Sequence, residues 1–167
     1  GADVVLVSTH WGTEYSNGVN SQQQTLAAQL AALGADVIIG TGPHVLEPVE
    51  WIPGQNGKQT LVWYSIGNFL STQLEIAHLI GGVAQFDVVK NLDDSIVIEN
   101  PRFLPTYMHY EWTPAQAAAG DLLARTNLKV YPLNQAATPL SLSLFNTSVE
   151  AQYEYVRSVL GPAVTVE

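Results

Sequence analysis

Short apolar runs at residues 4–7, 37–39 and 61–64 have the length and β-branched content of buried strands. Between the first two, Leu26, Leu30 and Leu33 recur at helical spacing. Asn20 or Ser21 can cap the start of this helix, and Gly34 is placed to end it. Residues 3–40 therefore predict a strand–helix–strand unit with parallel pairing and a right-handed crossover.

The next strands are predicted to pair antiparallel. Residues 47–52 and 59–64 flank a turn-rich segment at 53–58, which is typical of a hairpin. Residues 82–89 and 95–104 form a second predicted hairpin around residues 91–94. Helix-linked strands followed by antiparallel ones indicate the α/β class, as a layered α/β sandwich.

The chain after residue 104 is expected to be helical. Thr113, Pro114 and Gln116 form a capping box with proline at the first helical position, so we expect a helix to about Arg125, although Gly120 weakens it. Residues 147–150 read as a second capping box, and that helix should end at Leu160 before a glycine and a proline. We interpret both helices as packing elements.

Composition limits the function. The formal net charge is −9 with only six basic residues, which argues against a nucleic-acid partner because such binding needs clustered Lys and Arg. The absence of cysteine excludes disulfides and thiolate metal sites. No apolar run approaches the roughly 18 residues that a membrane-spanning helix needs.

Polar motifs follow each of the three apolar runs, at residues 8–12, 40–45 and 64–69. Groups at the carboxyl ends of parallel strands converge on one crevice, so His10, His44 and Asn68 are expected to share a site. Glu14 is a further candidate as a ligand, a base or a merely solvated side chain.

Other residues near these motifs are given structural roles. We interpret Trp11 as packing, and His78 and His109 as structural or peripheral. A single histidine at a strand end is more often structural than functional, so the prediction depends on the three motifs meeting.

The three motifs together resemble the CapA-type family of bacterial capsule-synthesis proteins, associated with poly-γ-glutamate and similar in fold to calcineurin-like metallophosphatases. The matching stretches are residues 5–15, 34–46 and 64–69, and the resemblance covers roughly residues 2–107. We therefore predict that residues 1–107 are the carboxyl-terminal portion of such a domain. Residues 108–167 are expected to form a helical extension that packs on it.

The resemblance implies a site in which strand-end Asp, His and Asn side chains hold two divalent ions. His10 and His44 match metal ligands, and His10, Glu14 and Asn68 become the catalytic candidates; the ion in the complete protein would be Mn, Fe or Zn. Two departures weaken this implication. Gly42 stands where the family usually has a histidine, and the family's amino-terminal aspartate and histidine motifs do not occur here in a usable position.

Two functions therefore remain open. The first is an accessory protein of capsule or poly-γ-glutamate synthesis on the extracellular face of the bacterial membrane, with a degenerate site and an anchor elsewhere. Its partners would be the membrane synthesis machinery and an acidic polymer. The alternative is an active metal-dependent hydrolase of a phosphoester or amide-linked polymer.

The start of the chain bears on both functions. The tripeptide at residues 1–3 recurs at 34–36, where it follows a helix, so Gly1 is expected to end a helix of a longer protein. Missing neighbouring strands would leave a sheet edge open to the absent portion or to self-association. This chain alone is expected to have little or no hydrolytic activity.

Overall fold

The computed structural model describes residues 2–167, so Gly1 and the helix end expected there lie outside the described residues. The first sheet and its helix comprise β1 Leu6–His10, α1 Ser21–Ala32, β2 Val37–Thr41, β3 Val49–Pro53 and β4 Gln59–Trp63. The second sheet comprises β5 Ile80–Lys90, β6 Ile96–Glu111, β7 Thr126–Pro132 and β8 Thr165–Val166. The other helices are α2 Pro114–Ala118, α3 Ala137–Leu142 and α4 Val149–Leu160, with 3-10 turns η1 Gln55–Gly57, η2 Ile76–His78, η3 Leu122–Ala124 and η4 Leu133–Gln135.

The first sheet has the strand order β1-β2-β4-β3. Strands β1, β2 and β4 are parallel, and β3 returns antiparallel beside β4, as the apolar pattern predicted. Along this sheet His10 pairs with Thr41, and Ile39 pairs with Trp63. The carboxyl ends of the three parallel strands therefore lie at one edge, where the polar motifs begin.

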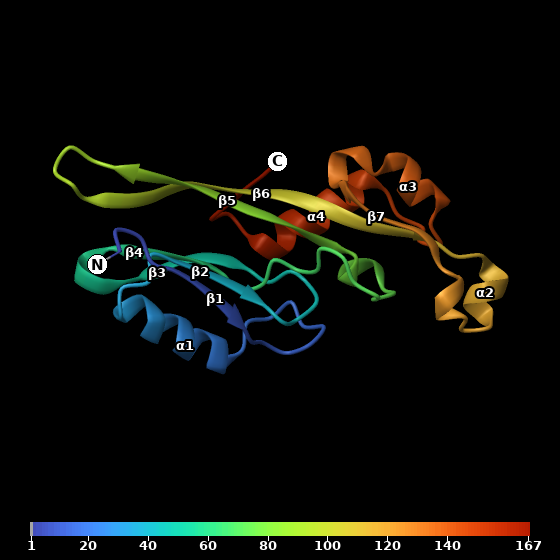
Figure 1. Cartoon of the computed structure of the whole chain (residues 1–167), viewed down its shortest axis with the longest axis horizontal. Helices are drawn as coiled ribbons and strands as arrows, with labels where there is room; N and C mark the ends of the chain where they lie inside the picture. The colour runs from blue at the N-terminus through green and yellow to red at the C-terminus, as the bar shows by residue number, and fades with distance from the viewer. Residues whose placement is uncertain (1) are drawn as a thin grey trace.

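Helix α1 covers one face of this sheet (Figure 1). Its start is the predicted one, because Asn20 and Gln23 form a reciprocal capping box, and Gly34 follows its end with a φ of 100°. The buried face consists of Gln23, Ala27 and Ala31, whereas Leu33 is 81% exposed. The leucine spacing thus predicted the helix but not the side that it buries.

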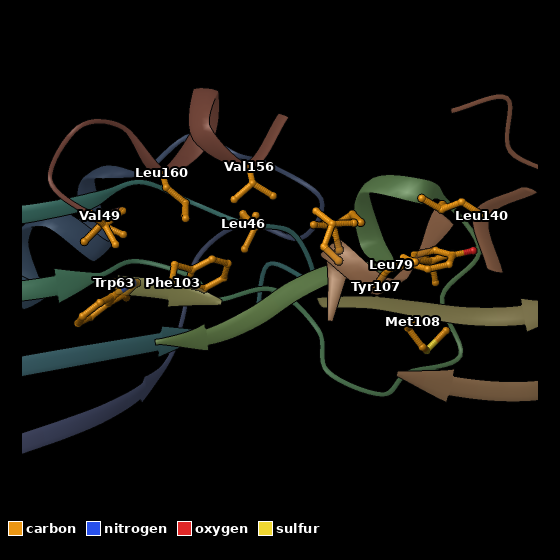
Figure 2. Packing of buried hydrophobic residues seen from close by; sticks show 14 of the residues in the cluster. Leu46, Val49, Trp63, Leu79, Phe103, Tyr107, Met108, Leu140, Val156 and Leu160 are labelled. Carbon is orange, nitrogen blue, oxygen red and sulfur yellow. The ribbon is translucent and has the colours of Figure 1, made fainter. Parts of the chain in front are cut away.

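The second sheet lies over the opposite face of the first sheet, and Figure 1 shows the two as separate layers. Trp63 of the first sheet and Phe103 and Tyr107 of the second are fully buried in one core, which α4 extends with Val156 and Leu160 (Figure 2). Each such side chain contributes roughly 1.5–3 kcal/mol by its burial. The layered α/β sandwich predicted from the sequence is confirmed.

Both predicted hairpins are present, and the second is longer than expected at its open end, where β5 begins at Ile80 and β6 continues to Glu111. The predicted helix to Arg125 is wrong: α2 begins with the Thr113 capping box but stops at Ala118, because Gly120 adopts a φ of 66°. The predicted capping box at residues 147–150 is also wrong, because the cap of α4 is Ser148, whose side chain accepts a hydrogen bond from Ala151 N. That helix does end at Leu160.

Strand β6 runs without interruption across residue 107, and β7 pairs with its carboxyl-terminal half. Residues 108–167 thus contribute strands as well as helices, and their core residues pack in the same cluster as the preceding part. The division into two domains at residue 107 stays a prediction.

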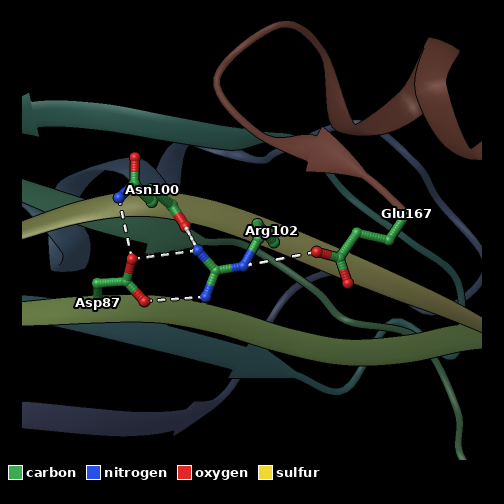
Figure 3. Close-up of polar contacts among 4 residues, drawn as sticks. All are labelled: Asp87, Asn100, Arg102 and Glu167. Carbon is green, nitrogen blue, oxygen red and sulfur yellow. Dashed lines mark hydrogen bonds and ion pairs between the residues drawn. The ribbon is translucent and has the colours of Figure 1, made fainter.

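An ion-pair network joins the end of the chain to the second hairpin (Figure 3). Arg102 donates two hydrogen bonds to Asp87, at 3.2 and 2.9 Å, and its Nε lies 3.5 Å from Glu167 Oε1. Asn100 donates a further bond to Asp87 at 2.9 Å. The hydrogen bonds from Arg102, and then that from Asn100, lower the pKa of Asp87 to about 2.

Candidate functional site

The loops that follow β1 and β2 run side by side. Trp11 N donates to Thr41 O at 2.9 Å, and Tyr15 N donates to Pro43 O at 2.7 Å. Trp11 also donates from its indole to Tyr64 O at 2.8 Å and stacks on the Tyr64 ring. Its predicted packing role is confirmed, and the indole ties the first motif to the third.

Gly42 lies where these two loops approach each other closely. Its φ is 125°, and a Cβ built on it would lie 2.2 Å from Trp11 O. A backbone oxygen at that distance leaves no room for any side chain unless a loop moves. The absence of the expected histidine at this position therefore has a structural reason in this chain.

His44 is held by Asn68, as the converging motifs predicted. Asn68 Nδ2 donates to His78 O at 2.9 Å and to His44 O at 3.2 Å, which fixes the orientation of the amide. Asn68 Oδ1 therefore faces His44 Nδ1, at 3.0 Å. Since an amide oxygen can only accept, the proton of a neutral His44 is on Nδ1 and Nε2 carries the lone pair.

Tyr15 and His78 complete this group. The ring of Tyr15 lies 4.5 Å from that of His78 and 5.8 Å from that of His44, between centroids. Gln73 Nε2 donates to the Tyr15 hydroxyl at 3.3 Å. We call Tyr15, His44, Asn68, Gln73 and His78 the His44 cluster.

His78 was predicted to be structural or peripheral, and its contacts with Asn68 and Tyr15 give it the structural role. Burial lowers the pKa of His78, the neighbouring Glu75 opposes that effect, and His44 adds to it. His78 is thus a neutral ring beside His44 near pH 7. It lies in an ordinary stretch of sequence, on the turn η2, and only the tertiary structure brings it to the site.

His10 is placed differently from His44. It is exposed, and its Nδ1 lies 3.4 Å from Thr41 Oγ1. The hydrogen bonds around Asn68 include His44 and His78 but not His10. Glu14 is exposed in the same loop. The structure therefore unites two of the three expected residues, and His10 lies at the end of the neighbouring strand.

Comparison with known proteins identifies the family of this site. Residues 1–73 match the family described as "Bacterial capsule synthesis protein PGA_cap". Over 128 residues, 77% of the chain, it is 41% identical to the "PGA biosynthesis protein CapA" of Bacillus subtilis (strain 168). Over 72 residues, 43% of the chain, it is 43% identical to the "Capsule biosynthesis protein CapA" of Bacillus anthracis. Residues 1–73 belong to the CapA-type family of bacterial capsule synthesis proteins.

The matched part of this CapA-type chain contains all three polar motifs. The aligned regions span only 31% of the Bacillus subtilis relative and 16% of the Bacillus anthracis relative. Within residues 2–167, no helix has the length and apolarity needed to cross a membrane.

The divalent metal implied by the resemblance can be tested against the side chains present. In the described part of this CapA-type chain, no group of three or more His, Cys, Asp or Glu residues is arranged to hold an ion. His44 has the orientation of a ligand, because its Nδ1 is held by Asn68 Oδ1 and its Nε2 carries the lone pair. The described residues do not make a complete metal centre.

Sequence reasoning missed a buried carboxyl group close in sequence to His44. Glu47 is fully buried, three residues after His44, and Gln23 of α1 donates to its Oε2 at 2.6 Å. Burial raises the pKa of Glu47 to about 7, although the bond from Gln23 lowers it in part. A lone acidic residue after two apolar ones offered no local signal of this environment.

Proposed function

We propose that this chain is part of an accessory protein of capsule or PGA biosynthesis that acts at the bacterial cell surface. The similarity to the two Bacillus proteins supports this proposal, since their names state PGA biosynthesis and capsule biosynthesis. The anchor would lie in a segment outside the described residues. The proposed partners are the membrane-bound synthesis machinery and the acidic polymer itself.

The single observation that carries the site is the fixed orientation of His44. With Nδ1 donating to Asn68, a neutral His44 offers a hydrogen-bond acceptor at Nε2. A carboxylate of the polymer is also an acceptor, so it would bind only the protonated ring. For the neutral ring, the matching group on an amide-linked polymer is the backbone N–H. We therefore propose that the site binds the amide groups of the polymer. We also propose that the arrangement of the site is metallophosphatase-like but degenerate.

A second candidate is the metal-dependent hydrolase, and the same lone pair favours it. Neutral imidazole is the form that binds Mn, Fe or Zn, and its other N–H is usually held by an oxygen, as it is here by Asn68. The remaining ligands would have to come from residues beyond those described. His10 is the other candidate in this chain, together with Glu14 as an acid or base.

The exposed edge of the first sheet supports a proposed partner. Strand β1 is at the end of the sheet order. Leu6 on it is 51% exposed, although its pairing partner Val37 is fully buried. Edge strands of this kind pair with other segments. We propose that another part of the same protein, or a second copy, covers this edge.

The complete protein in its own host tests the function. His44→Ala should reduce the polymer at the cell surface without reducing the amount of the protein, whereas the matched control Lys90→Gln on the distant hairpin should leave the polymer unchanged. Unaltered polymer in His44→Ala contradicts the proposed role of the site. Metal analysis of the same two variants then separates the candidates: stoichiometric Mn, Fe or Zn that is lost only in His44→Ala supports the hydrolase, and none at millimolar supply excludes it.

A further inference from the structure

A second cavity lies on the second sheet and shares no residue with the His44 cluster. Its volume is about 580 Å³, within the range of small-molecule sites. Strands β6 and β7 form its floor, and η4 and α3 form a wall; in Figure 1, α3 lies next to β7. The cavity is thus built by the part of the chain that follows the family match.

The register of β6 and β7 places charged and titratable side chains together in this cavity. His109 pairs directly with Lys129, so the two side chains stand on the same face of the sheet. Glu111 lies two residues further along that face, and its Oε1 is 3.8 Å from His109 Nε2. The register shifts between His109 and Glu111, where Asn127 of β7 adopts a φ of 55°. Such bulges redirect side chains next to binding sites.

The cavity has a neutral floor and two opposite charges at its rim. His109 is 2% exposed, and burial lowers its pKa although Glu111 opposes that effect. Tyr107 lies on its other side, with its hydroxyl 3.4 Å from His109 Nδ1. The exposed Lys129 is positioned by Tyr131, with Nζ 4.8 Å from the ring centroid. Among residues 2–167, no carboxylate lies within 4.0 Å of Lys129 Nζ.

The remaining wall of the cavity is mostly apolar. Leu128, Pro139 and Leu142 line it beside the two rim charges. A ligand that matches these surfaces carries a carboxylate for Lys129, an ammonium group for Glu111 and an apolar side chain between them. One lysine is too little for a polyanion, and one carboxylate beside one histidine is too little for a metal ion.

We propose that this cavity binds a small zwitterion with an apolar side chain, an α-amino acid of the leucine class. Lys129 binds the carboxylate, Glu111 binds the ammonium group through the oxygen that does not face His109, and the apolar wall takes the side chain. His109 lies beside Glu111 in the floor of the cavity, with its Nε2 3.8 Å from Glu111 Oε1. This site goes beyond the proposed function and does not depend on it.

Titration of the 167-residue chain, followed by ¹H–¹⁵N NMR spectra, tests the proposal with L-leucine as the probe. We expect saturable shifts at residues 109–111, 127–131 and 135–142, with a Kd on the order of 1 mM. N-acetyl-L-leucine lacks the ammonium group and L-leucinamide lacks the carboxylate, so each should bind roughly tenfold more weakly. Glycine lacks the apolar side chain and should also bind more weakly.

Variants of Lys129 and Glu111 test which residue binds the carboxylate and which binds the ammonium group. Lys129→Gln should weaken the binding of L-leucine and leave the binding of L-leucinamide unchanged. Glu111→Gln should weaken the binding of L-leucine and leave the binding of N-acetyl-L-leucine unchanged. The control Lys90→Gln should behave as the unaltered chain. No saturation by L-leucine up to about 20 mM, shifts confined to another surface, or equal binding of all four compounds would overturn the proposal. The comparison of compounds needs no variant, so it decides the question even if a variant fails to fold.

Discussion

The ionisation of Glu47 makes a sharp prediction about stability. Glu47 is fully buried, its Oε2 accepts one bond from Gln23, and its Oε1 has no partner among the described residues. Burial raises its pKa from an ordinary 4.5 to about 7. A group whose pKa is raised by folding stabilises the protein below its unfolded pKa, and this contribution is lost as the pH rises through the folded pKa.

The size of the effect follows from the same two pKa values. One pKa unit corresponds to 1.36 kcal/mol, so a rise from 4.5 to about 7 corresponds to about 3 kcal/mol in full. Between pH 5 and pH 8.5 the loss is about 2.5 kcal/mol. Because Glu47 is fully buried, solvent does not screen the effect appreciably.

The Glu47→Gln variant removes the titration but keeps an oxygen that accepts from Gln23. Its unpaired amide group adds a cost that is the same at both pH values. Urea unfolding followed by tryptophan fluorescence at pH 5 and pH 8.5 measures both proteins. The free energy of unfolding of the unaltered protein should fall, relative to that of the variant, by about 2.5 kcal/mol. Taking this difference cancels the contributions of the histidines.

The matched control is Glu154→Gln, which changes an exposed glutamate of α4. It should keep the pH dependence of the unaltered protein. If Glu47→Gln and the unaltered protein instead showed parallel pH dependence, Glu47 would be ionised in the fold at pH 5, and the buried neutral carboxyl would be refuted.

Three further predictions concern the loops, the cluster and the helix. Gly42→Ala should destabilise the chain by roughly 2 kcal/mol or more, because its φ is 125° and the new Cβ meets Trp11 O; a change in the free energy of unfolding below 0.5 kcal/mol would contradict this packing. His78→Gln should reduce the decrease in the free energy of unfolding as the pH falls below about 6.5, because the lowered pKa of His78 means that the unfolded chain binds the proton at a higher pH than the folded chain does. A decrease in the free energy of unfolding between pH 5 and about 6.5 that equals that of the unaltered protein would count against it. Asn20→Ala should cost about 1 kcal/mol through loss of the α1 cap, and thermal unfolding unchanged from that of Ser141→Ala would count against that cap.

Local signals predicted the framework well because they depend on neighbours in the chain. The Asn20 and Thr113 capping boxes and the turn at residues 53–58 use contacts within a few residues, and all are present. The predicted end of α2 lies about seven residues too late, and the predicted cap of α4 lies one residue too early. Gly120 ends α2 early through its φ of 66°, and Ser148 caps α4 by accepting a hydrogen bond from Ala151 N.

Strand β7 escaped prediction for a different reason. Residues 126–132 are exposed or half-buried, and their apolar alternation is limited to Leu128 and Val130. Their strand conformation comes from hydrogen bonding to β6, a partner whose length the sequence did not reveal. Tertiary context overrides propensity at such edges.

The sequence by itself determined the α/β class, the parallel unit and the meeting of His44 with Asn68, because strand direction alone places both at the same sheet edge. Only the tertiary structure decided that His78 and Tyr15 join them, that Gly42 has no room for a side chain, and that Glu47 is buried. These features arise where segments far apart in the chain come into contact. Burial and close approach are properties of that packing, and no single stretch of residues encodes them.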